Sequence, residues 1–250
     1  MTRSSPSTAT PFSLTSTSTD NATAGDATFF DYGGFSGAVT WFFDSATAGN
    51  ATFNNFSGGN GANDGVTVFE DESTAGTATI YCNGGDTVFH KHSTAANSTL
   101  IANLDTVFFL EHSTAGEATV IANGARSSKA GNGTILFLNG NASAGEATLV
   151  ANGGHNGGPG GLIAFYAETR GHKARVRVFD NGALDISSHS ALAAMSIGSL
   201  EGTGTVALGV NNLAVGRNHL NTTFSGIISD DKKGGSLTKV GSGTLALNRE

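Results

Sequence analysis

One twelve-residue phrase recurs along the chain and constrains its fold more than any other feature of the sequence. The clearest copy is residues 113–124, Ser-Thr-Ala-Gly-Glu-Ala-Thr-Val-Ile-Ala-Asn-Gly. Successive copies follow at intervals of 24, 27, 20, 20, 29 and 26 residues, the last of them a degenerate copy at residues 171–180. Their central steps are Ala24-Gly25, Ala48-Gly49, Ala75-Gly76, Ala95-Ala96, Ala115-Gly116 and Ala144-Gly145. A period of about 20 to 50 residues indicates a solenoid or an array of repeats.

Side chains within each copy alternate as they do in a β-strand. In the clearest copy, Ala118, Val120 and Ala122 share one face, whereas Thr119 and Ile121 share the other. The same alternation recurs in residues 51–53, 78–80, 98–100 and 147–149. The small-large-small face therefore predicts the core of the protein, and the opposite face predicts its outer surface.

Each copy then reaches an asparagine, which is followed by a second apolar run. The asparagines are Asn83, Asn103, Asn123 and Asn152, and the apolar runs are residues 40–43, 67–69, 87–89, 106–109 and 134–137. Because Asn and Gly tolerate left-handed backbone, the asparagine column predicts a sharp corner, and stacked amides could form a ladder along it. Insertions of variable length follow the asparagine at residues 57–65, 125–131 and 153–161. One edge of the solenoid should therefore carry the loops.

Short strands of this kind bury too little apolar surface on their own. If each turn of the chain coils onto the last, every strand gains a hydrogen-bonded neighbour and a buried face. The sequence thus predicts an all-β fold, a parallel β-helix (β-solenoid) with rungs of roughly 20 residues and loop insertions. The composition agrees, because 36 glycines in 250 residues and 13% charged residues suit a turn-rich β protein. Residues 1–20 are rich in Ser and Thr and predict a disordered or degenerate lead-in, followed by a single β-helix over residues 21–250.

The repeated phrase changes in the last part of the chain, and that part contains a motif found in a known family of repeats. Residues 234–247 read Gly-Gly-Ser-Leu-Thr-Lys-Val-Gly-Ser-Gly-Thr-Leu-Ala-Leu. This stretch resembles the autotransporter-associated β-strand repeat, also called the passenger-associated transport repeat. The copies over residues 21–181 resemble the degenerate rungs that precede that motif in long passengers, and residues 182–250 are the rungs that end in it.

The resemblance implies a right-handed, single-stranded parallel β-helix that forms a structural stalk or passenger segment of a secreted or cell-surface protein. Such a segment presents loops, assists vectorial folding and is not an enzyme. It is expected outside the cell or at the outer-membrane surface. The N-terminus has no apolar stretch typical of a signal peptide, so we expect a fragment, with any signal upstream, or a copy that is not exported.

Charge and cysteine content exclude several partners. Thirteen basic and twenty acidic residues without a basic cluster predict no binding to nucleic acid or to an anionic membrane surface. No segment approaches the roughly 18 apolar residues of a membrane-spanning helix. Cys82, the single cysteine, falls in the small core column and is interpreted as a core residue. We expect a monomer without a cofactor, with any extracellular glycan or protein ligand bound through the loop insertions.

Candidate site residues each have a structural interpretation that is favoured over the chemical one. The carboxylates of residues 70–72 could serve as acid and base, but the same slot holds residues 91–92 and 111–112 in the next copies, which indicates a solvated corner. His92 and His112 lie 20 residues apart and should stack about 4.8 Å apart, with Glu72 one rung away. Such a set could hold a transition metal, but no third firm ligand is identifiable. The sequence therefore assigns no catalytic, cofactor-binding or metal site.

Two glycine-rich loops and two further functional classes have weaker support in the sequence. Residues 58–66 distantly resemble a calcium-binding nonapeptide with its acidic residue one position late, and residues 153–161 lack the lysine and helix of a phosphate-binding loop. A β-helical carbohydrate-active enzyme, similar to a polysaccharide lyase or glycosidase, would need charged groups at matched positions of three adjacent rungs. A glycan- or host-binding adhesin would use exposed Phe, Tyr and His side chains at the loop edge.

Overall fold

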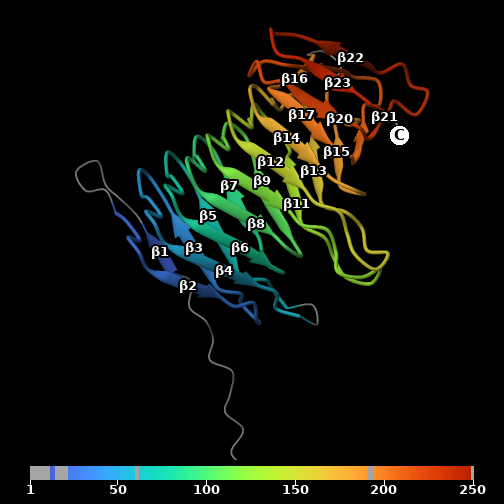
Figure 1. Cartoon of the computed structure of the whole chain (residues 1–250). Helices are drawn as coiled ribbons and strands as arrows, with labels where there is room; N and C mark the ends of the chain where they lie inside the picture. Colours follow the sequence, from blue (N-terminus) through green and yellow to red (C-terminus); the bar gives the residue numbers. More distant parts are fainter. Residues whose placement is uncertain (1–11, 15–21, 60–61, 191–193, 249–250) are drawn as a thin grey trace, which may run out of the picture.

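The chain coils into a β-solenoid of about nine turns, which confirms the predicted parallel β-helix (Figure 1). The computed structural model describes residues 12–14, 22–59, 62–190 and 194–248, and these contain 23 strands and no helix. Every pair of neighbouring strands is parallel. The rungs follow one another in chain order, from β1 and β2 at one end to β22 and β23 at the other (Figure 1).

Three sheets form the sides of the coil. The first contains β1 (Phe12–Leu14), β3 (Val39–Phe42), β5 (Val66–Phe69), β7 (Thr87–Phe89), β9 (Thr106–Phe109), β11 (Thr134–Phe137), β13 (Leu162–Phe165), β15 (Ala183–Asp185), β18 (Thr205–Ala207) and β21 (Ile227–Ser229). The second contains β2 (Thr28–Asp31), β4 (Thr52–Phe56), β6 (Thr79–Asn83), β8 (Thr99–Ala102), β10 (Thr119–Ala122), β12 (Thr148–Ala151), β14 (Arg175–Val178), β17 (Ser199–Gly202), β20 (Thr222–Phe224) and β23 (Leu245–Leu247). The third contains β16 (Met195–Ile197), β19 (Asn212–Val215) and β22 (Ser236–Lys239).

The lead-in expected over residues 1–20 includes β1, which pairs in parallel with β3 and so forms a degenerate rung. The rest of that stretch lies outside the described residues. In the described part of the chain, no helix is long and apolar enough to cross a membrane.

The repeated Ser-Thr-Ala-Gly phrase forms the turn that leads into the strands of the second sheet from β2 to β12. The hydroxyl of Thr114 accepts a hydrogen bond from the amide of Gly116 at 3.1 Å. The same contact recurs at Thr23, Thr47, Thr74 and Thr94. These threonines also pair with one another as single parallel bridges, which hold the third side of the coil where no full strand forms. A Ser/Thr turn therefore explains why the phrase is repeated.

Left-handed backbone lies mainly in the phrase. At the expected asparagine corner only Gly84, after Asn83, has a positive φ, of 103°, so the corner expectation is wrong for the other three copies. Gly116 has φ of 61° and Gly145 has φ of 58°, whereas none of the four asparagines has a positive φ. A Cβ atom at Gly145 would lie 2.6 Å from the carbonyl oxygen of Gly116 in the rung before it. A second left-handed column runs through Asp44, Asp71, Lys91 and Glu111.

The core is built from two columns of side chains that face each other across the coil. Ala118, Val120 and Ala122 are fully buried and Thr119 and Ile121 are partly exposed, which confirms the predicted inward face. From the first sheet, six phenylalanine rings stack with centroids 4.5–4.9 Å apart. They are Phe42, Phe69, Phe89, Phe109, Phe137 and Phe165. Each of the six rungs from β3 to β13 thus contributes one ring to a continuous core.

Candidate functional site

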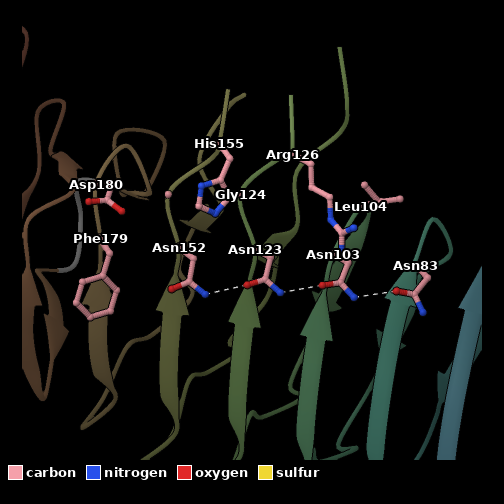
Figure 2. Close-up of a pocket in the computed structure, with 11 residues that line it drawn as sticks. Asn83, Asn103, Leu104, Asn123, Gly124, Arg126, Asn152, His155, Phe179 and Asp180 are labelled. Carbon is pink, nitrogen blue, oxygen red and sulfur yellow. Dashed lines mark hydrogen bonds between the residues drawn. The ribbon is translucent and has the colours of Figure 1, made fainter. Parts of the chain in front are cut away.

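A groove of about 670 Å³ follows the asparagine column along the loop edge of the solenoid (Figure 2). It is lined by Asn83, Asn103, Leu104, Asn123, Gly124, Arg126, Asn152, Gly153, His155, Phe179 and Asp180. The asparagines form its floor, at the C-terminal ends of four successive strands of the second sheet (Figure 2). The groove therefore lies at the edge where the sequence predicted the loops.

The asparagine side chains form the predicted amide ladder. The Nδ2 of Asn152 donates to Oδ1 of Asn123, that of Asn123 to Asn103, and that of Asn103 to Asn83, each at 2.8 Å. An amide offers two N–H donors and an oxygen with two lone pairs. A ladder member in the middle of the row uses one donor and one lone pair along the row, which leaves one of each for the groove.

Backbone register decides which side chains continue this row. The backbone amides of Asn103, Asn123 and Asn152 each donate to the carbonyl of a small buried residue in the preceding rung, which is Cys82, Ala102 or Ala122. The amide of Phe179 makes the same bond to Ala151 at 2.9 Å, so Phe179 takes the place of an asparagine in the next rung. At the other end of the row, Phe56 is the register partner of Asn83. Aromatic rings therefore flank the four asparagines at both ends.

The rim of the groove comes from two insertions that hold each other in place. The amide of Ala125 donates to the carbonyl of Pro159, and the amide of His155 donates to the carbonyl of Ala125, both at 2.8 Å. Arg126 and His155 are exposed and lie above the asparagine row (Figure 2). Residues 153–161 are thus tied by backbone hydrogen bonds to the insertion of the previous rung.

The carboxylates at residues 70–72 lie at a corner where a lysine of the next rung pairs with two of them. Lys91 Nζ is 3.0 Å from Glu70 Oε2 and 2.8 Å from Asp71 Oδ1, while Glu72 is exposed. The hydrogen bond from Lys91 holds the pKa of Asp71 below its usual value. Glu70 and Asp71 therefore both pair with a cation of the next rung, as expected of a structural corner.

His92 and His112 stack as their 20-residue spacing predicts. Their ring centroids are 5.1 Å apart and the ring planes are inclined by 14°. Among the described residues, no group of three or more His, Cys, Asp or Glu side chains could hold a metal ion. Glu72 therefore does not complete a three-ligand set with the two imidazoles.

Two further sequence candidates have structural roles. In the glycine-rich loop of residues 58–66, Asp64 Oδ1 accepts the amide hydrogen of Gly58 at 2.8 Å and so closes the loop. Cys82 is fully buried with its Sγ 3.2 Å from the hydroxyl of Thr87, and burial raises the pKa of its thiol to about 12. Cys82 is therefore a core residue, as predicted. The nucleophile in cysteine chemistry is the thiolate, and a thiol with this pKa forms little of it.

A polar cluster inside the first rungs is a feature that the sequence interpretation missed. Asp31 and Asn55 occupy the inward position that Cys82 holds one rung later, by strand register. The Thr40 hydroxyl donates to Asp31 at 3.0 Å, and the Thr67 hydroxyl lies 3.0 Å from Asn55 Oδ1. Burial raises the pKa of Asp31 to about 6. The sequence does contain a signal for this cluster. When residues 28–31 and 52–55 are aligned with the later copies, a polar residue stands at the inward position in each.

A second missed feature is a cavity of about 440 Å³ that brings cationic side chains together. Arg170 and His172, which precede β14, line it together with Arg217, which precedes β20. Burial and the positive charges of both arginines lower the pKa of His172. Stacking thus brings two arginines from distant segments to one cavity, where Glu168 also lies, so the lining carries both signs of charge.

Comparison of the chain with protein-family models, with curated proteins and with solved structures finds no match in any of the three. The residues and geometry of the chain therefore carry the functional argument.

Proposed function

We propose that this chain is a structural stalk segment of a secreted or cell-surface protein of the autotransporter-passenger type, which holds length, presents loops at one edge and performs no catalysis. The observation that supports it best is the unbroken stacking of rungs from β1 to β23. Each strand inside the two long sheets pairs with the strands of the rungs before and after it, and only the end strands have a single partner. A chain built in this way gains stability as a sum of rung and interface contributions, which suits a rod.

Rung-by-rung stacking also suits folding that accompanies export. A newly emerged rung needs only its predecessor as a template, because both the phenylalanine stack and the asparagine ladder connect adjacent rungs. The transport-repeat stretch at residues 234–247 supports the same function. It supplies β22 and β23, the last strands of the third and second sheets.

The test is display of the chain on a bacterial surface. The full 250-residue chain, with an epitope tag, would be fused between a signal peptide and an autotransporter translocator barrel, and surface labelling and protease resistance would be measured. We expect surface display of a protease-resistant chain, and loss of resistance in a Val120→Asp variant that places a charge in the core. Failure of the wild-type chain to reach the surface, while a known passenger in the same fusion does, would contradict the proposal.

A further inference from the structure

We propose that the asparagine groove binds a neutral, extended β-1,4-linked glycan that lies along the solenoid axis. This site goes beyond the stalk function and does not depend on whether the chain is exported. Its floor is the row of Asn83, Asn103, Asn123 and Asn152, and Phe179 closes one end (Figure 2).

The chemistry of the floor matches the hydroxyl groups of a sugar. After the ladder bonds of 2.8 Å are made, Asn103 and Asn123 each keep one N–H donor and one lone pair of the amide oxygen. A hydroxyl group is both a donor and an acceptor, so one amide can serve one sugar hydroxyl in both roles. All four asparagines are only partly buried, so these groups are open to a ligand.

The spacing of the floor favours a glycan over a peptide strand. Successive asparagines belong to adjacent hydrogen-bonded strands, which lie about 4.8 Å apart. An extended peptide advances only about 3.3 Å per residue, so its groups would lose register with the row after one or two residues. An extended pyranose unit is close to one rung in length. Successive units of a β-1,4-linked chain are turned over relative to each other, so one edge of the chain presents ring hydroxyl groups and a hydroxymethyl group in alternation, with one polar set for each amide.

The end and the rim of the groove agree with a neutral sugar chain. The Phe179 ring, which is partly exposed, continues the row by one rung and offers an apolar surface to the C–H face of a pyranose ring. Arg177 lies 5.2 Å from the centroid of that ring, which fixes the ring against its own strand. Arg126 and Asp180 carry opposite charges at the rim, so the groove has no excess of either sign.

The test is isothermal titration calorimetry of the full chain with cellobiose, cellotetraose and cellohexaose. We expect affinity to rise from cellobiose through cellotetraose to cellohexaose, because the groove spans about five rungs from Asn83 to Phe179 and each rung can contact one sugar unit. A hexamer of galacturonic acid tests the assignment as neutral. Absence of binding by cellohexaose at millimolar concentration, or equal or tighter binding of the acidic hexamer, would overturn the proposal.

Two variants and a matched control locate the site. Phe179→Ala should weaken cellohexaose binding about tenfold, and Asn152→Ala, which removes only the last bond of the ladder, should weaken it several-fold. Phe108→Ala removes a partly exposed ring from the first sheet, away from the groove, and should leave affinity unchanged. If Phe179→Ala binds as well as the wild-type chain while its melting temperature is unchanged, the ligand does not occupy this groove.

Discussion

The phenylalanine stack offers a direct test of which face of each strand is the core. Phe109 is fully buried, and its ring stacks on Phe89 at 4.9 Å and on Phe137 at 4.8 Å. A buried Phe→Ala change costs about 3–5 kcal/mol. Because the ring has a stacked partner on both sides, each worth about 0.5–1.5 kcal/mol beyond burial, we expect Phe109→Ala to cost about 4–5 kcal/mol.

The neighbouring ring provides a control that makes the same chemical change. Phe108 lies on the outer face of the same strand and is partly exposed, so Phe108→Ala should cost about 1 kcal/mol. Urea unfolding followed by far-UV circular dichroism measures both free energies. Phe109→Ala should also broaden the transition, because a weakened rung in the middle of an array uncouples its two halves. Equal losses in the two variants, or a larger loss in Phe108→Ala, would refute the assignment of the core.

Three further predictions follow from the strand faces, the turns and the buried polar cluster. Val120→Asp should unfold its own and adjacent rungs and Thr119→Asp should cost little, as measured by the two melting temperatures. Ala96 has φ of 50° where other copies have glycine, so Ala96→Gly should stabilise the chain by about 1 kcal/mol and Gly116→Ala should destabilise it by at least as much in urea unfolding. Burial raises the pKa of Asp31 to about 6, so the folded chain holds this proton more tightly than the unfolded chain. The contribution of Asp31 to the free energy of unfolding should therefore fall by about 2 kcal/mol from pH 4.5 to 7, and a pH series of urea titrations should show a fall that is smaller by this amount in Asp31→Asn. The fall that remains in the variant belongs to Asp86, because burial raises its pKa to about 7.

The fold was predictable because the repeat reports strand register directly. Residues in equivalent places of two copies, such as Val120 and Leu149, are paired partners in adjacent strands. The amide ladder was predictable for the same reason, since one side chain at one corner in four successive copies must stack. The loop edge followed from the position of the insertions, because only a corner outside the strands accepts added residues.

The parts that were not predictable depend on local chemistry or on distances across rungs. Both glycine and asparagine can adopt left-handed backbone, so the sequence alone does not say which of the two positions in the repeat does so. The position is set by the turn at Gly116, which the threonine hydroxyl closes. The buried cluster around Asp31 lies in the least regular copies, where a polar side chain replaces a small apolar one. The groove and the cavity at Arg170 and Arg217 are lined by residues from several rungs. Which of these residues meet depends on the lengths of the loops, and no single copy of the repeat contains that information.

The central claim is that each 20-residue repeat is one rung that stacks on its neighbours, and removal of one rung tests it most directly. Deletion of residues 93–112 removes β8 and β9 and puts Ser113 and Thr114 in the place of Ser93 and Thr94, which should restore the register of both long sheets. We expect this variant to keep the far-UV circular dichroism spectrum and a cooperative melting transition. Deletion of residues 103–112 alone removes β9 but keeps β8, and should abolish cooperative melting. Equal damage from the two deletions, or better folding of the half-rung variant, would contradict the account.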